Sequence, residues 1–242
     1  IFPINFLEIP KLLKTLEEIM PKVIINAVGI TNMDFCEQNS KLAIQINSLP
    51  LKYLSQFSKK NKIKLVQIST DHFFTGDKNK KHKENSKIEI LNTYAKTKFE
   101  AEKYTKFNKN HIIVRTNFTG YRRKNNQKTF IEWLLNNFKK KKSFCSFSDF
   151  YCSTIDVQSL SNIIYDLIDL DFKGMINIGS SDTFSKKEFA YKIAELLKLN
   201  KRLILEGSLK SLKTRRAESL GLDVTKIERI LKYKMPDLNK DM

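Results

Sequence analysis

Tyr94 and Lys98 are the two residues whose types and spacing most directly suggest chemistry. They are four positions apart in a segment with helical character, so their side chains would lie on one face of a helix. An ammonium close to a phenol favours the tyrosinate, which lowers the tyrosine pKa and lets it exchange a proton near neutral pH. The pair alone is weak evidence. A chain this rich in lysine is expected to contain the spacing by chance, as a surface tyrosine beside a solvated lysine.

Short apolar runs alternate with amphipathic segments, and together they define the scaffold that would position this pair. Four runs are typical of buried strands, at residues 22–28, 64–70, 111–117 and 175–179. Helical periodicity predicts helices at residues 9–20, 40–59, 92–107, 129–138, 154–168 and 185–197. Pro50 predicts a kink or a break in the second helix, and Asn92, Asp156 and Ser185 lie near predicted helix starts. The alternation predicts an α/β fold with a parallel sheet, whereas residues 71–90 are expected to form a polar loop.

Polar residues gather at the carboxyl ends of all four predicted strands. In a parallel α/β sheet the ligand lies beyond these ends. The positions that would face it are residues 27–31, 69–71, 116–117 and 179–180. The topology therefore predicts a site there, independently of any motif.

Composition narrows the class of protein further. The chain has 242 residues, of which 41% are hydrophobic, so it can bury a sizeable core. No apolar run approaches the roughly 18 residues of a membrane span. The three cysteines show no CxxC spacing and the three histidines no ligand spacing, which favours a reducing cytoplasm and predicts no metal site.

The net charge of +18 has two interpretations. One is a protein that binds nucleic acid or an anionic membrane, and the other is a surface coated with lysine. We favour the second, because the charge is spread along the chain and arginine, the residue suited to bidentate phosphate contacts, is scarce. A positive surface still suits an anionic small substrate such as a nucleotide diphosphate.

The ordered motifs INAVGITNMDFCE, ISTDHFFTGD, NTYAKTKFEAE and VRTN set Tyr94 and Lys98 in a longer pattern. Taken together, they resemble the extended short-chain dehydrogenase/reductase family, and within it the branch of dTDP-4-dehydrorhamnose reductase and its sugar-nucleotide relatives. The resemblance is strong over residues 22–123 and weaker to the end of the chain. It implies a Rossmann-like doubly wound sheet, NADPH or NADH as cofactor, and reduction of a nucleotide-linked 4-keto-6-deoxysugar.

The resemblance also implies roles for particular residues. Thr70 matches the hydroxyl that bonds the substrate carbonyl, Tyr94 the general acid, and Lys98 the residue that lowers the tyrosine pKa and holds the nicotinamide ribose. Cofactor contacts are expected at Asn26, Ala27, Val28, Ser69, Tyr94 and Lys98. Substrate contacts are expected at Thr31, Asp71, Asn117 and Arg216.

The same resemblance suggests a division of the chain. Residues 1–120, with 152–180 returning to them, would form the NAD(P)-binding domain, and residues 121–151 and 181–242 the substrate-binding part. The Gly-rich GxxGxxG turn that binds the cofactor diphosphate in the family has no counterpart, since no two of the 7 glycines lie close together. We therefore expect a truncated chain of a longer enzyme, with a short non-catalytic homologue as the alternative.

Several alternatives stay open. Related 4-ketosugar reductases, a C4 epimerase, and a regulatory protein of the same fold all share these motifs. A homodimer is suggested only by the resemblance, and no nucleic-acid or membrane partner is expected.

Some single residues also have a structural interpretation. Asp71 could contact substrate or cap a turn. Glu37 is expected to fix the 31–37 loop, Asn47 to bond backbone, Trp133 to lie in the core, and Cys36 to be a buried apolar residue.

Overall fold

The computed structural model describes residues 5–76, 78–122 and 128–238, and these form two compact units. The first contains residues 1–70, 90–115 and 171–176, and the second contains residues 71–89, 116–170 and 177–242. The segment 71–89 thus belongs with the second unit, although the sequence suggested a first domain over 1–120. Residues 123–127, in the predicted substrate-binding part, lie outside the described residues. The functional division of the chain stays a prediction.

A parallel sheet forms the centre of the first unit, as the alternation of strands and helices predicted. Strands β1 (Val23–Asn26), β2 (Lys64–Ile68) and β4 (His111–Thr119) lie in that order, and β8 (Gly174–Ile178) also pairs with β4. Every residue of β2 is buried or half-buried, and α4 and α5 pack against this strand. Burial of successive residues is what the sequence predicted for this strand, and it extends to the polar residues Lys64 and Gln67.

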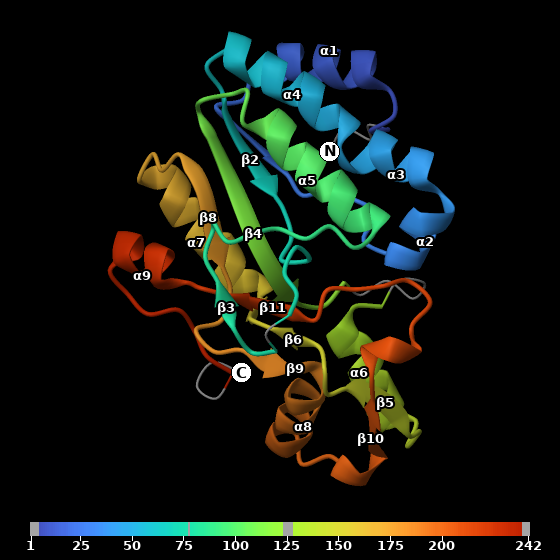
Figure 1. Ribbon diagram of the computed structural model, residues 1–242. Coiled ribbons are helices and arrows are strands. Elements are labelled where there is room, and N and C mark those ends of the chain that lie inside the picture. Colours follow the sequence, from blue (N-terminus) through green and yellow to red (C-terminus); the bar gives the residue numbers. More distant parts are fainter. Residues whose placement is uncertain (1–4, 77, 123–127, 239–242) are drawn as a thin grey trace. The chain divides into compact units, whose positions relative to one another are not determined.

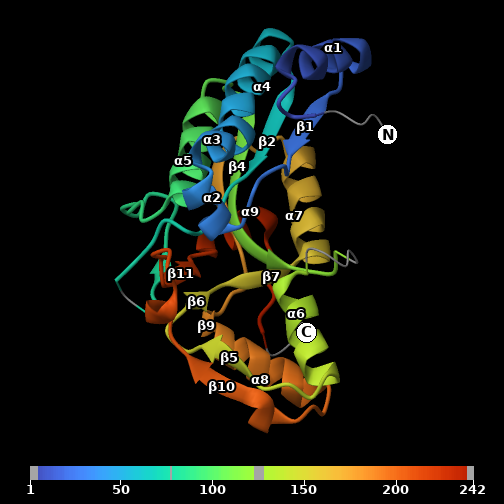
Figure 2. The same ribbon diagram turned by 90° about the vertical axis from the view of Figure 1, so that its right-hand side faces the viewer.

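Within the described residues, the first unit contains five helices. They are α1 (Ile9–Ile19), α2 (Met33–Gln38), α3 (Ser40–Asn47), α4 (Leu49–Lys60) and α5 (Thr93–Thr105). Figures 1 and 2 show α3, α4 and α5 side by side along one face of the strands. The predicted break at Pro50 is confirmed. One helix ends at Asn47 and the next begins at Leu49, with the proline in its first turn where no N–H is needed.

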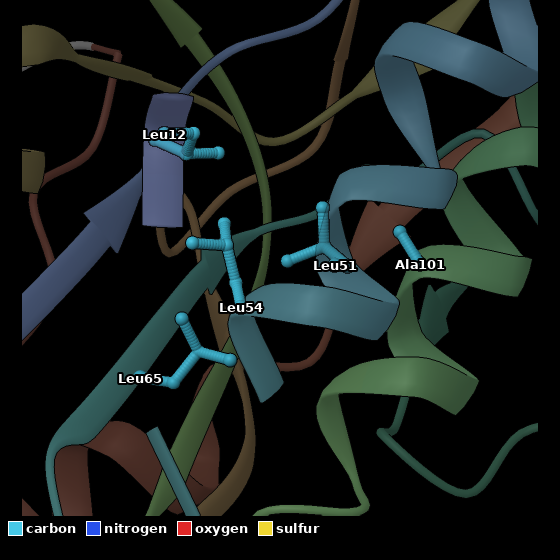
Figure 3. Packing of buried hydrophobic residues seen from close by; sticks show 5 residues of the cluster. All are labelled: Leu12, Leu51, Leu54, Leu65 and Ala101. Carbon is cyan, nitrogen blue, oxygen red and sulfur yellow. The ribbon is translucent and has the colours of Figure 1, made fainter. Parts of the chain in front are cut away.

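An apolar cluster packs α1, α4 and α5 against β2. Leu12 of α1, Leu51 and Leu54 of α4, Leu65 of β2 and Ala101 of α5 meet in one buried group (Figure 3). Because the cluster includes α5 and β2, it fixes the helix that carries Tyr94 and Lys98 to the strand that leads to Thr70. Burial of each large side chain contributes about 1.5–3 kcal/mol.

The second unit is built from short strands and capped helices. Its helices are α6 (Phe130–Lys139), α7 (Val157–Asp169), α8 (Lys186–Leu196) and α9 (Thr225–Leu231), with 3-10 turns η1 (Lys201–Leu203) and η2 (Leu209–Ser211). A four-stranded sheet has the order β3 (Lys81–His82), β11 (Ser219–Leu222), β6 (Tyr151–Cys152) and β9 (Phe184–Ser185). A two-stranded sheet pairs β5 (Phe144–Phe147) with β10 (Ile204–Gly207), and α8 packs on both strands (Figure 1).

Two sequence-based expectations are corrected in this unit. Residues 154–156 were expected to begin a helix, but they form β7 (Thr154–Asp156), which pairs with the end of β4. The helix starts only at Val157, because Asp156 stays extended and caps it by accepting from the N–H of Ser159. The segment 71–90 was expected to be loop throughout, yet it contains β3, which is too short to show a strand pattern.

Helices α6 and α8 each begin at a side-chain cap, Thr129 for α6 and Ser185 for α8. Each side chain accepts from the backbone N–H three residues on, and the glutamate at that position, Glu132 or Glu188, bonds back to the cap. This capping box stabilises α6 and α8 from their own residues. The cap expected at Ser185 is confirmed.

None of the helices in the described ranges is both long and apolar enough to cross a bilayer. Over the same residues, no group of histidine, cysteine and acidic side chains is arranged to hold a metal ion.

Candidate active site

Helix α5 presents the Tyr94–Lys98 pair, and its first turn is held firmly. Asn92 caps the helix as expected, with its side-chain oxygen 2.8 Å from the N–H of Ala95. The carboxylate of Glu37 accepts from the N–H and the hydroxyl of Thr93, at 2.5 and 2.9 Å. Glu37 is therefore structural, as expected. The segment expected to be a loop at residues 31–37 is largely the helix α2, and Glu37 joins this helix to α5.

Tyr94 lies against an apolar cluster. Its side chain packs with Met33 and Cys36 of α2 and Ala43 of α3, and it is 7% exposed. Cys36 is fully buried, as expected, and burial raises the pKa of its thiol to about 11, so it is an apolar residue and not a nucleophile. The cluster keeps water from most of the Tyr94 ring.

The ammonium of Lys98 is buried next to the end of β2. It donates to the carbonyl oxygen of Ile68 at 2.5 Å. Burial lowers the pKa of Lys98 to about 8, and the carboxylate of Glu102 opposes this effect. Thr70, which is 3% exposed, follows Ile68 by two residues. Thr70, Tyr94 and Lys98 thus lie in one unit, on α5 and on the segment that leaves β2.

The residues expected to contact the cofactor lie on two strand ends of the first unit. The Asn26 amide donates to Gln67 at 2.7 Å, so its side chain links β1 to β2. Ala27 and Val28, directly after β1, are exposed. The Ser69 hydroxyl donates to Glu102 at 2.6 Å, while its N–H bonds Val114.

Asn47 holds the loop that follows β1. Its side chain accepts from the N–H of Ile30 at 2.7 Å, donates to the carbonyl of Ile30, and donates to the Thr97 hydroxyl on α5. The predicted structural role of Asn47 is therefore confirmed. Thr31, expected to contact substrate, is exposed on this loop.

The other three expected substrate residues belong to the second unit. Asp71 is buried, with a carboxylate oxygen 3.9 Å from a ring nitrogen of His72. Burial and the cations of Arg216 and Lys186 lower the pKa of His72 to about 3, so the ring is neutral at physiological pH. Asn117, on β4, accepts from the hydroxyl of Thr154 at 2.9 Å.

Trp133 was expected in the core, but the structure leaves it exposed. The indole stacks on Phe130 and meets Phe144 edge-on, and 36% of it is exposed. It is therefore a partly covered ring at the surface of the second unit.

A buried ion pair was missed by the sequence reasoning. Arg115 of β4 donates twice to the carboxylate of Glu102 on α5, at 2.9 and 2.8 Å, and the two side chains are 2% and 0% exposed. Two signals were available in the sequence. Glu102 continues the four-residue spacing of Tyr94 and Lys98, and an arginine inside an apolar strand requires a charged partner.

Comparison with known proteins gives the family. The model of the RmlD substrate binding domain matches residues 3–242, and the chain belongs to this family. A probable low-salt glycan biosynthesis reductase of Haloferax volcanii is 21% identical over 99% of this chain and 81% of that protein. The dTDP-4-dehydrorhamnose reductase of Salmonella typhimurium is 27% identical over 62% of this chain but only 49% of its own length.

Solved structures confirm the fold. The dTDP-4-dehydrorhamnose reductase of Bacillus anthracis, determined in complex with NADP, superposes with a TM-score of 0.87 at 24% identity, covering 97% of this chain and 83% of that one. The predicted Rossmann-like α/β class is therefore correct.

Proposed function

We propose that the protein containing this chain is an NAD(P)H-dependent reductase of a nucleotide-linked 4-keto-6-deoxysugar, of the dTDP-4-dehydrorhamnose reductase kind, and that it serves polysaccharide biosynthesis. Two of the relatives named above are called dTDP-4-dehydrorhamnose reductases, and the third is called a probable glycan biosynthesis reductase. The structural observation that carries the proposal is the buried Lys98 ammonium, one helical turn from Tyr94 and bonded to the strand end that leads to Thr70.

The chemistry assigned to the chain is proton transfer and binding. Tyr94 is the general acid, and its phenolic proton goes to the oxygen of the C4 carbonyl as that carbon is reduced. The hydroxyl of Thr70 donates to the same oxygen and stabilises the charge that develops there. The Lys98 ammonium favours the tyrosinate that remains. When bound, the nicotinamide cofactor supplies the hydride.

The first unit fits the nicotinamide end of the cofactor. An ammonium has three N–H donors, and one of those on Lys98 is used by Ile68, which leaves two for ribose hydroxyls. The backbone after β1 is exposed at Ala27 and Val28, where contacts were expected. Because the side chains of Asn26 and Ser69 are engaged with Gln67 and Glu102, we assign their cofactor contacts to backbone groups.

Thr31, Asp71, Asn117 and Arg216 remain our candidates for substrate binding. We further propose a cytoplasmic location, because all three cysteines are unpaired and a reducing compartment keeps them so.

The test is to measure the reduction of dTDP-4-dehydrorhamnose by the complete protein. The reaction is monitored through the loss of NADPH absorbance. Tyr94→Phe should lower kcat by about 10²–10⁴-fold, the usual contribution of a general acid, with little change in NADPH affinity. Tyr104→Phe is the matched control, because Tyr104 is on the same helix but packs against Phe107 and the apolar cluster. Unchanged turnover in Tyr94→Phe would remove the assigned role. NADPH binding without any ketosugar reduction would instead favour the regulatory homologue.

A further inference from the structure

Three buried polar side chains lie between β2, β4 and α5. Glu102 accepts from the Ser69 hydroxyl at 2.6 Å and from two guanidinium nitrogens of Arg115 at 2.9 and 2.8 Å. The two charged side chains are almost completely buried, and Ser69 is 5% exposed. We call these three residues the Ser69–Glu102–Arg115 cluster. All of it belongs to the first unit.

The cluster is costly, so its position needs an explanation. A buried ion pair gains little over apolar side chains of similar size, since both charges must leave water. Its distinctive property is geometric, because two parallel charge-assisted hydrogen bonds fix both distance and orientation. Here they fix the strand β4 against the helix α5.

The cluster is continuous with the proposed catalytic residues on both sides. Ser69 precedes Thr70 directly, so the bond to Glu102 constrains the backbone that carries the Thr70 hydroxyl. On α5, Glu102 is one turn beyond Lys98, which is one turn beyond Tyr94. The Glu102 carboxylate is therefore bonded to the segment before Thr70 and lies on the helix face that carries Tyr94 and Lys98.

Glu102 also acts on the charge of Lys98. Its carboxylate favours the protonated amine and opposes the effect of burial. Other titratable or charged groups near α5 include Tyr94 on the helix, Cys36 and Glu37 on α2, and Arg115 on β4. Removing the Glu102 charge would therefore leave Lys98 less able to stay an ammonium.

We propose that Ser69, Glu102 and Arg115 are positioning residues that set the separation of Thr70 from the Tyr94–Lys98 face of α5. The proposal rests on the proposed reductase function for its catalytic meaning. Misplacing a catalytic group by about 1 Å can lower the rate by up to 10²-fold. This effect on the rate would explain why a buried ion pair is present despite its desolvation cost.

Ser69→Ala is the first variant, because it removes one hydrogen bond and leaves the ion pair intact. We expect kcat to fall on the order of 10-fold, with KM and the Kd for NADPH unchanged. Ser55→Ala is the matched control: Ser55 is also buried in the first unit and bonds the end of α5 at Thr105 and the N–H of Asn108. Wild-type kcat in Ser69→Ala, or an equal fall in Ser55→Ala, would overturn the proposal.

A second measurement needs no turnover. The pKa of Lys98 can be followed by NMR in protein labelled at the lysine side chains, with Lys98→Gln to identify its signal. Glu102→Gln should lower that pKa below the wild-type value, and an unchanged value would overturn the electrostatic part. The double variant Glu102→Gln/Arg115→Met removes both charges of the ion pair and is used if the single variant does not fold. If the wild type reduces no ketosugar but the pKa still shifts, the proposed function fails while the coupling within the cluster stands.

Discussion

The Lys98 ammonium donates a 2.5 Å hydrogen bond to the carbonyl oxygen of Ile68, and this contact ties α5 to the last residue of β2. Burial disfavours the charged form of an amine, and one hydrogen bond to a carbonyl offsets only part of this effect, so the pKa falls. The pKa of Lys98, at about 8, is therefore close enough to physiological pH to limit activity.

Turnover should fall as the pH rises through about 8, because Lys98 then loses the proton that lets it hold the ribose and favour the tyrosinate. The measurement is kcat against pH in the complete protein. Lys103→Gln should leave the profile unchanged, because Lys103 is on the same helix but exposed and paired with Glu100. A profile that is flat to well above pH 8 would contradict the role of Lys98.

Breaking the buried ion pair should destabilise the protein strongly. Arg115→Met leaves the Glu102 carboxylate buried without its partner, and we expect a loss of about 3–5 kcal/mol in the free energy of unfolding. The double variant Arg115→Met/Glu102→Met should recover most of this loss. Urea unfolding checks both, with Glu100→Gln as the exposed control, for which a change of about 0–1 kcal/mol is expected. A double variant as unstable as the single one would mean that the pair itself is strongly stabilising.

His72 should make the second unit sensitive to acid. Its folded pKa of about 3 is below its ordinary value of 6.5, so the unfolded chain binds the proton first. The stability associated with the neutral ring is complete above pH 6.5 and is lost as the pH falls towards 3. His72→Asn should show a shallower fall in stability over this range, measured by urea unfolding at several pH values. If the free energy of unfolding falls with pH equally in wild type and variant, His72 does not cause the acid sensitivity.

Asn47→Ala should weaken NADPH binding, and this loss of affinity should be its main effect rather than a loss of thermal stability. The change removes both bonds to Ile30 and the one to Thr97, so the exposed loop after β1 loses its support. We expect a rise of about 10-fold in Kd, equivalent to roughly 1.4 kcal/mol, in a fluorescence titration. Asn61→Ala is the control, because the side-chain amide of Asn61 donates to the carbonyl of Phe57 on its own helix. Equal effects of the two variants on Kd would mean that the loop does not touch the cofactor.

The sequence predicted the first unit well, because its elements carry strong local signals. The segment at residues 64–70 was predicted as a buried strand, and β2 is buried or half-buried throughout. Asn92 marks a helix start because its side chain caps α5, and Pro50 does so because it lacks an N–H. The four-residue spacing of Tyr94 and Lys98 was informative because it coincided with other motifs.

The second unit was less predictable for a physical reason. Strands such as β3 and β6 contain two residues each, too few to show alternation, and they are defined by partners far away in the chain. The role of Glu102 was missed for the same reason. Its partners Ser69 and Arg115 lie on other elements, so only the folded arrangement shows why a charge is buried there.

The order of the four-stranded sheet has a consequence for synthesis on the ribosome. Its inner strand β11, near the end of the chain, lies between β3 and β6, which are made much earlier. β6 can pair with β9 earlier, but the edges of β3 and β6 that face β11 must stay unpaired until residues 219–222 have left the exit tunnel. Such delayed pairing of distant segments slows folding and exposes strand edges. A nascent chain halted before Ser219 would thus be a natural target for chaperones, even with its first unit already folded.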